Sequence, residues 1–341
     1  MARIFKRSFG IIAFNAGQTV SLDLPRNHVF KSVYLRLTGT LGITVGTAGP
    51  FNSEQPMSLI RSVALVRNGS DVLQRADGGS LWQAARYNSD GDPQVTPVSA
   101  LTVASYPFSA DIPIDLAAWR MSNPSQTLLR AVGTSSLRLD VTWGQTTDIC
   151  ALGAATLAIT NCQVEVFTEE IMDLTGDFGD KLVVVTSRPV TVATNQFTVD
   201  LPVGPFYRRL IFKSTHTPAG AGATSVLTDA MINRVRIISD GSFFHTDRMS
   251  WNALQGMNKR NYAIGNIHPL NSASNVLSVL QGYGVVDFAE DGNVGGLIDT
   301  RGSSSFQAEL DVNFGTGGLT GAQQIQIIQE QIVPARVAAA A

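Results

Sequence analysis

The feature that most constrains the fold is a short pattern that occurs twice. In Met57–Val72, apolar residues alternate with other residues up to Asn68-Gly69, and a second extended run follows. Ala230–Phe244 repeats this order around Asp240-Gly241, in the second half of the chain. Asn-Gly and Asp-Gly between such runs predict a β-hairpin with a type I′ turn, because both turn positions must accept a positive φ. A hairpin repeated so far along the chain indicates that a larger unit is duplicated.

Other segments recur in the same order in both halves, at a nearly constant spacing. The pairs are Thr19–Pro25 with Phe197–Val203, the run from Phe30 with the run from Phe206, Ile114–Leu116 with Val286–Phe288, Leu139–Gly144 with Leu310–Gly315, and Gln163–Ile171 with Gln324–Ile332. The sequence therefore predicts two homologous domains. We expect them over residues 10–176 and 177–335, with an N-terminal arm over residues 1–9 and a C-terminal tail over residues 336–341.

The hydrophobic period within each half is mostly two. Short alternating runs separated by Gly, Pro, Asn and Ser predict antiparallel β-structure. About eight strands per half indicate a jelly roll, the eight-stranded sandwich of two Greek keys. Each hairpin is followed by a helical segment with a tryptophan, Trp82 or Trp251, and we expect the two to pack these helices in matched positions. For the first helix we predict a capping box of Ser80 and Gln83.

The composition is that of a folded chain with few charged residues on its surface. Apolar residues make up 44% and charged residues 15%, against about 25% charged in typical domains, which favours extensive subunit contacts. A net charge of −2 and a pI of 6.1 give no general affinity for nucleic acid. We predict neither a signal peptide nor a membrane span, and synthesis in the cytoplasm. Cys150 and Cys162 are expected to be free thiols, with a single bridge as the alternative.

No catalytic or metal-binding pattern stands out in the sequence. The four histidines are His28, His216, His245 and His268, with no pair spaced for a metal. Asp111 with Asp115, and Asp287 with Asp291, lack the spacing of a calcium loop and are interpreted as solvated loop carboxylates. Glu169-Glu170 is interpreted as a hydrophilic strand end. We therefore predict that the protein is not an enzyme and holds no cofactor or metal.

The basic N-terminus has two interpretations. Arg3, Lys6 and Arg7 alternate with Phe5 and Phe9, so this segment could be an arm held by anionic lipid, nucleic acid or a partner. Three charges give only weak attraction, and termini are commonly disordered. The sequence does not decide between these.

Two tandem jelly rolls, each with a hairpin followed by a helix, resemble the double jelly-roll major capsid proteins of adenovirus, tectiviruses, corticoviruses and related tailless viruses. The resemblance spans residues 10–335 and is carried by 58–72 with 79–87, by 231–244 with 249–262, and by the closing strands 139–144 and 310–315. Loops this short are similar to those of the compact bacteriophage members. The resemblance implies homotrimers that act as pseudo-hexagonal capsomers in the shell of an icosahedral virion.

The resemblance also implies partners. These are neighbouring trimers and the minor capsid, penton and membrane proteins of the virion, with the arm on the inner side, where Arg3, Lys6 and Arg7 would meet an inner membrane. Specific nucleic-acid binding is not expected. The main alternative is a tandem sandwich that binds carbohydrate or a receptor, as in a spike or adhesin. That function predicts a cluster of exposed aromatic and Asp/Asn residues on one set of loops, and the sequence shows no such cluster.

Overall fold

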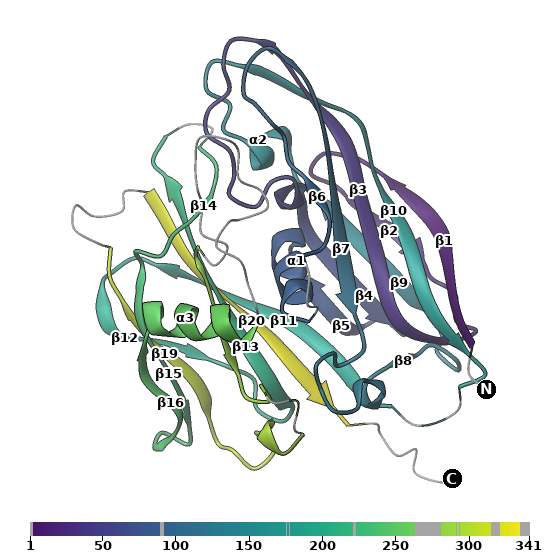
Figure 1. Cartoon of the computed structure of the whole chain (residues 1–341), viewed down its shortest axis with the longest axis vertical. Coiled ribbons are helices and arrows are strands. Elements are labelled where there is room, and N and C mark those ends of the chain that lie inside the picture. The colour runs from purple at the N-terminus through teal and green to yellow at the C-terminus, as the bar shows by residue number, and fades with distance from the viewer. Residues whose placement is uncertain are drawn as a thin grey trace.

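The structure of the chain is a computed structural model. The residues that it describes are 3–88, 92–174, 176, 178–220, 223–262, 281–290, 292, 294–314 and 321–334. The strands form two β-sandwiches that stand side by side (Figure 1). We call the strands between Arg3 and Met172 the first roll, and those between Asp180 and Val333 the second roll.

The first roll consists of two antiparallel sheets. One has the order β1 (Arg3–Ala13), β10 (Thr156–Met172), β3 (Val29–Val45) and β7 (Ala104–Asp115), with β6 (Val95–Thr96) on β7 and β8 (Leu129–Arg130) on β3. The other has the order β2 (Thr19–Asp23), β9 (Leu137–Trp143), β4 (Ile60–Arg67) and β5 (Asp71–Ala76). In β9 every second side chain is buried, which is the alternation expected of a strand with one face on a core.

The second roll repeats this topology in its eight main strands. One sheet has the order β11 (Asp180–Val190), β20 (Gly321–Val333), β13 (Phe206–Pro218) and β17 (Tyr283–Asp287), with β18 (Ile298–Asp299) and β14 (Val226–Leu227) on β13. The other has the order β12 (Thr194–Asp200), β19 (Phe306–Val312), β15 (Ile232–Ser239) and β16 (Phe243–Ser250). The predicted all-β class with two tandem eight-stranded jelly rolls is therefore confirmed.

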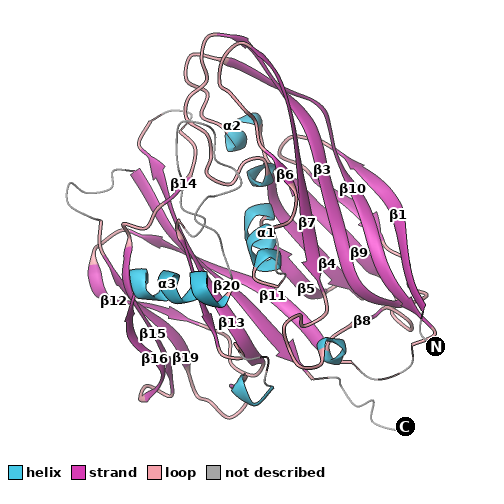
Figure 2. Ribbon diagram, in the orientation of Figure 1, coloured by secondary structure: helices cyan, strands magenta, loops and turns pink. Residues whose placement is uncertain are grey.

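Three α-helices and three short 3-10 helices interrupt the strands in the described residues (Figure 2). They are α1 (Gly78–Arg86), α2 (Thr146–Ile149), α3 (Trp251–Asn261), η1 (Met57–Leu59), η2 (Pro124–Gln126) and η3 (Val294–Gly296). The predicted cap at Ser80 is wrong: Asp77 caps α1, and its Oδ1 accepts a hydrogen bond from Ser80 N at 2.8 Å. Asp77 directly follows β5 and comes before Ser80 in the chain, so its carboxylate caps the helix. The helix therefore begins at Gly78, and Ser80 lies inside it.

The two tryptophans do not occupy matched positions. Trp251 is the first residue of α3, whereas Trp82 is the fifth residue of α1. Both are buried. Trp251 donates from Nε1 to Asp229 Oδ1 at 2.9 Å. The helices correspond, but their tryptophans fill different parts of their cores.

The two hairpin turns have the same geometry. Asn68 and Gly69 have φ of 53° and 79°, and Asp240 and Gly241 have φ of 52° and 69°. Each loop contains three residues, one more than the predicted two-residue type I′ loop, because Arg67 faces Asp71 and Ser239 faces Phe243. In each turn, the side chain of the first residue also accepts a hydrogen bond from the backbone of a second loop. Asn68 Oδ1 accepts from Ser135 N at 2.8 Å, and Asp240 Oδ1 accepts from Ser304 N at 2.6 Å.

The rolls are joined along a strand edge. β5 of the first roll pairs in parallel with β11 of the second, with Gln74 opposite Val183 and Arg75 opposite Val184. Helix α1 lies between the two rolls (Figure 1), and all nine of its residues are buried. Each roll has its own apolar core, although the core of the first roll also includes residues of the second, such as Ile211 and Ile328.

Candidate functional site

The basic residues near the N-terminus lie in a strand. β1 pairs with β10 from Arg3, opposite Met172, to Ala13, opposite Gln163. The prediction of a separate arm is therefore wrong from residue 3 onward. The physical reason is apolar burial, since Ile12 lies in the core of the first roll and Phe9 packs against that core.

Lys6 and Arg7 contact carboxylates of β10. Lys6 Nζ is 3.5 Å from Glu169 Oε1, and Arg7 Nε is 3.2 Å from Glu170 Oε1. Glu170 is fully buried and also accepts a hydrogen bond from Thr168 Oγ1 at 2.7 Å. The interpretation of Glu169-Glu170 as a hydrophilic strand end is thus wrong. The side chain of Lys6 nevertheless remains 75% exposed and is available to a partner.

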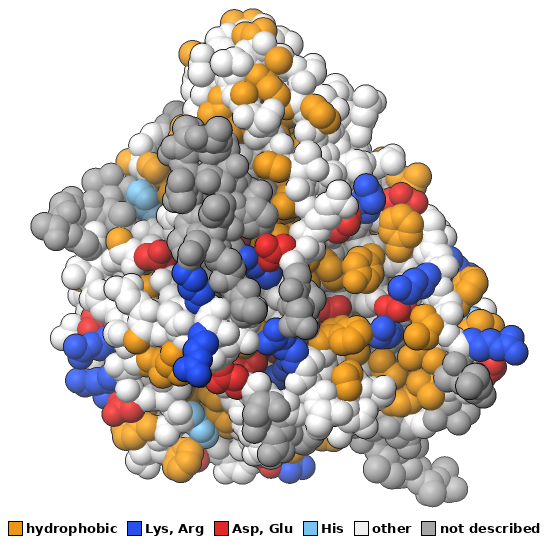
Figure 3. Space-filling model, in the orientation of Figure 1, with side chains coloured by type: hydrophobic (Ala, Val, Ile, Leu, Met, Phe, Trp, Pro, Cys, Tyr) orange, Lys and Arg blue, Asp and Glu red, His pale blue; other side chains and the backbone are white. Residues whose placement is uncertain are grey.

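Two adjoining cavities lie on the outer face of the β1–β10–β3–β7 sheet. Their volumes are about 470 and 620 Å³, and both are lined by Tyr34 and Asp111. At the far end, Lys31 Nζ lies 4.5 Å from the ring centroid of Trp119. Apolar side chains gather over this roll, on the right of Figure 3. The surface therefore combines exposed aromatic groups with charges of both signs, as interface centres and rims do.

Asp111 and Asp115 both lie within β7. Burial raises the pKa of each carboxyl above its ordinary value. Asp115 accepts a hydrogen bond from Asn88 Nδ2 at 2.8 Å. The interpretation of these residues as solvated loop carboxylates is wrong. Asp291, like His268, lies outside the described residues.

A buried ionic cluster centred on Glu330 lies where the rolls meet. Its carboxylate contacts Arg209, Arg208 at 3.4 Å and Lys181 at 3.7 Å, and all four side chains are at least 98% buried. Arg209 Nη2 also donates to the first roll, to Asn88 Oδ1 at 2.7 Å and Ala84 O at 2.9 Å. Burial opposes the charge on Glu330, but its three cations lower its pKa to about 2. Burial also lowers the pKa of Lys181, to about 8.

A second ionic cluster centred on Lys213 crosses the same junction. Lys213 Nζ in β13 lies 2.6 Å from Glu54 Oε2 and 3.1 Å from Asp77 Oδ1, both in the first roll. Tyr283 of the second roll donates to Glu54. Burial raises the pKa of Glu54, whereas Lys213 and Ser80 outweigh burial at Asp77 and lower its pKa. The cap of α1 is thus also an ion-pair partner of the second roll.

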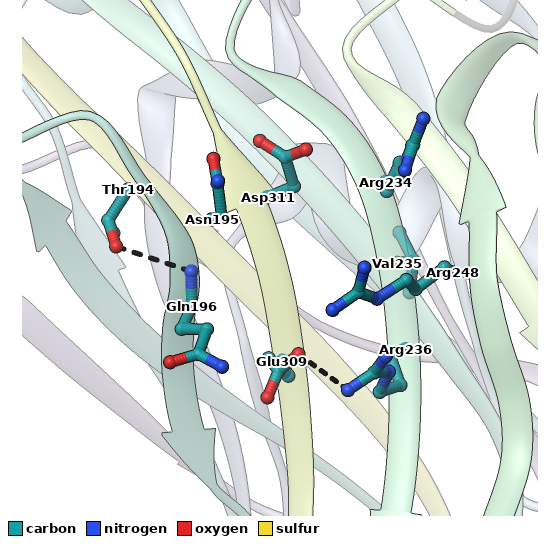
Figure 4. Close-up of a pocket in the computed structure, with 9 residues that line it drawn as sticks. All are labelled: Thr194, Asn195, Gln196, Arg234, Val235, Arg236, Arg248, Glu309 and Asp311. Carbon is teal, nitrogen blue, oxygen red and sulfur yellow. Dashed lines mark hydrogen bonds and ion pairs between the residues drawn. The ribbon is translucent and has the colours of Figure 1, made fainter.

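A third cavity, of about 410 Å³, lies on the outer face of the β12–β19–β15–β16 sheet (Figure 4). It is lined by polar residues of neighbouring strands. Arg236 of β15 forms ion pairs with both neighbouring strands. Its Nη1 is 3.0 Å from Glu309 Oε1 of β19, and its Nε is 3.0 Å from Asp247 Oδ1 of β16. Its lining offers carboxylates, guanidinium groups and amides, but no nucleophile beside a base.

The other expectations on chemistry concern the histidines, the cysteines and a membrane span. No three His, Cys, Asp or Glu side chains of the described residues are grouped to hold a metal ion. His245 shares a 2.7 Å hydrogen bond with Ser239 Oγ. Cys150 and Cys162 are both free, and burial raises their pKa values to about 11 and 12. In the described part of the chain, no helix is long and apolar enough to cross a membrane.

The junction clusters were missed by reasoning from the sequence. Their signal is a charge inside an apolar strand, as in Phe206–Lys213 and Ile327–Ile332. Such a charge indicates a buried partner, because an unpaired one would cost several kcal/mol. The sequence does not say which residue pairs with it.

Comparisons with known proteins find the same architecture over the full length of the chain. No protein-family model matches, and no curated protein matches. Among solved structures, the STIV MCP is similar at a TM-score of 0.69, with 16% identity over 99% of both chains. The major capsid protein P2 from bacteriophage PM2 is similar at 0.61, with 12% identity over 99% of both chains. The Faustovirus major capsid protein is similar at 0.57, with 9% identity over 98% of this chain and 91% of that one.

The chain has the double jelly-roll fold. The architecture is shared with these proteins at identities that show the fold and leave function to be argued separately. In a double jelly roll, the surfaces of interest are the strand edges and outer sheet faces that the chain itself leaves uncovered.

Proposed function

We propose that this protein is the major capsid protein of an icosahedral virus and a component of the virion shell. The observation that carries the proposal is the fusion of two rolls of the same topology, edge to edge, in one chain that matches major capsid proteins from end to end. The protein then acts through assembly and is not an enzyme. We propose the domain bounds expected from the sequence, with Arg3–Phe9 added to the first domain.

The duplicated roll explains how a single chain could tile a shell. A head-to-tail contact that closes after three copies presents six similar sandwiches around one axis. This homotrimer has a pseudo-hexagonal outline, and such outlines fill a flat facet with neighbouring trimers. The ionic clusters of Glu330 and Lys213 would set the angle between the two rolls of each copy, because charges buried this deeply tolerate little displacement.

The end of the sandwich where β1 begins is our candidate for the inner side of the shell. In Figure 1, β1 begins and β20 ends toward the bottom of the view. Arg3 would there meet anionic lipid or the minor capsid, penton and membrane proteins of the virion. Three basic residues in a chain with a net charge of −2 do not support genome condensation.

The test is assembly of the purified full-length chain. Native mass spectrometry should give a particle of three 36.4 kDa chains, and electron microscopy should show pseudo-hexagonal tiles, sheets or shells. A chain that stays monomeric at assembly concentrations would refute the proposal. Retention of that monomer on a glycan column would favour the carbohydrate-binding alternative.

A further inference from the structure

The junction inside the chain provides a template for a contact between chains. The first roll offers the edge strand β5 and the helix α1, and the second roll covers them with the edge strand β11 and the outer face of its β11–β20–β13 sheet. Because the second roll repeats the first, its strand β16 and helix α3 correspond to the covered β5 and α1. In the first roll, the edge strand β1 and the outer face of the β1–β10–β3 sheet correspond to the covering β11 and β11–β20–β13 face. These two counterparts are left without a neighbour within the described part of the chain.

The strand edges correspond residue by residue. β1 and β11 are both eleven residues long and each begins its roll, and Lys6 faces Glu169 as Val183 faces Glu330. β5 and β16 each follow one of the two equivalent turns. β11 is covered by β5, whereas β1 and β16 each end the order of their sheet. An uncovered edge of this length invites a further strand.

The sheet faces correspond as well. Ile211 and Ile328 of the second roll are fully buried in the core of the first roll. The equivalent residues of the first roll are Tyr34 and Phe167, since each pair holds the same register in its sheet. Tyr34 is 41% exposed. The first roll therefore presents aromatic side chains at the positions that the second roll uses to bury apolar surface.

The helices show the same imbalance. All nine residues of α1 are buried, but α3 buries only Trp251, Leu254 and Asn258. Met257, which borders the buried stripe, is 46% exposed. The difference arises because the second roll covers α1, whereas the outer face of α3 is left exposed.

Exposed aromatic residues gather on these uncovered surfaces. Four aromatic side chains of the described residues are more than 40% exposed: Phe5, Tyr34, Phe243 and Phe244. They lie on β1, β3 and β16, and aromatic residues are enriched at interfaces. β1 and β16 lie on opposite sides of the molecule (Figure 1), as a head-to-tail contact requires.

We infer that β16 and α3 of one copy bind β1 and the outer β1–β10–β3 face of the next copy, with the two edge strands parallel. The inference rests on the proposed function and specifies the contact by which three copies close. The pairing of β5 with β11 within the chain sets the register between copies. Thr246 and Lys6 are the equivalents of Gln74 and Val183, so they should lie opposite each other. Asp247 and Arg7 are the equivalents of Arg75 and Val184, so they should form the next pair. The last pair has opposite charges, and the side chain of Asp247 is 60% exposed.

The test is a disulfide between the predicted neighbours. The double variant Lys6→Cys/Thr246→Cys, oxidised as the assembled protein, should give covalent dimers and then covalent trimers on a non-reducing gel. Each single variant should give neither, which also controls for Cys150 and Cys162. The matched control is Ile11→Cys/Thr246→Cys, which moves one cysteine about 16 Å along the strand and should not cross-link.

A second variant tests the helix face without new cysteines. Met257→Glu should leave the melting of the monomer unchanged and abolish the trimer, whereas Val203→Glu, on a loop residue of similar exposure, should leave the trimer intact. A native-mass trimer without cross-links above the single-variant background would overturn this contact and leave the capsid proposal standing. Cross-linking of Lys6→Cys alone would overturn it too, since it requires two β1 strands to meet. A chain that forms no trimer refutes both.

Discussion

Replacement of Glu330 by glutamine is the most direct test of how the rolls are held together. Glu330 is the carboxylate that Arg208, Arg209 and Lys181 all contact in its cluster. Its pKa falls from an ordinary 4.5 to about 2 in the folded protein. At about 1.4 kcal/mol per pKa unit, this shift corresponds to about 3 kcal/mol of stabilisation at neutral pH. Removal of one partner of a buried pair costs about 3–5 kcal/mol, so we expect Glu330→Gln to lose about that much.

Urea unfolding followed by tryptophan fluorescence measures this loss, because Trp82 is buried in α1 beside the junction. The pH dependence identifies its source. A carboxyl with a lowered folded pKa contributes its full stabilisation above about 4.5, so the difference between wild type and variant should shrink as the pH falls from about 4.5 to about 2. Both proteins must be compared in the same oligomeric state.

The matched control is Glu309→Gln, which makes the same change in the partly exposed pair with Arg236. We expect a loss of at most about 1 kcal/mol there. If Glu330→Gln costs no more than this control, or if its effect is the same at pH 3 and pH 7, the cluster does not hold the rolls together as argued.

Three further predictions concern the junction and the turns. Lys181→Met should raise the free energy of unfolding at pH 7 by about 1–3 kcal/mol, because burial lowers the pKa of this lysine to about 8 and because Glu330 stays paired with Arg208 and Arg209. The gain should fade between pH 8 and 10.5, where the wild type gains stability as the folded lysine loses its proton, and a destabilised variant at pH 7 would contradict the argument. Asp77→Ala should lower the free energy of unfolding in urea by about 2–3 kcal/mol, since it removes a helix cap and a partner of Lys213. The control Ser250→Ala, at the exposed cap of α3, should lower it by about 1 kcal/mol, and equal losses would show that the ion pair of Asp77 with Lys213 adds no stability. Gly69→Val should lower thermal stability by about 2 kcal/mol, because a β-branched residue is forced to a φ of 79°, whereas Gly69→Asn should be tolerated. Unaltered melting of the valine variant would mean that the turn can change its conformation.

Reasoning from the sequence succeeded where neighbouring residues carry the information. The hairpins at Asn68 and Asp240 follow from turn chemistry, and the strand Leu137–Trp143 follows from its period of two. The order of such elements, repeated at a nearly constant spacing, indicates a tandem fold. The identity of a helix cap was less secure. Asp77 and Ser80 are both good capping residues, and the end of β5 decides between them.

The errors concerned residues whose environment is made by distant parts of the chain. Arg3–Phe9 has the composition of a basic arm, but β10, the last strand of the first roll, supplies a strand to pair with and carboxylates for its charges. Asp115 has the appearance of a loop carboxylate, but it is the last residue of β7, accepts a hydrogen bond from Asn88, and has its pKa raised by burial. A charge can be identified from the sequence, whereas its desolvation and its partner are properties of the packed molecule.

The sequence by itself determined that the protein is a duplicated β-sandwich, because alternation, turn residues and repeat spacing are local or additive signals. The tertiary structure alone decided that the halves meet through β5 and β11, that Glu330 and Lys213 neutralise that junction, and that β1, β16 and α3 remain uncovered. Contacts between segments so far apart depend on the shape of two finished sandwiches, and no stretch of sequence encodes that shape on its own.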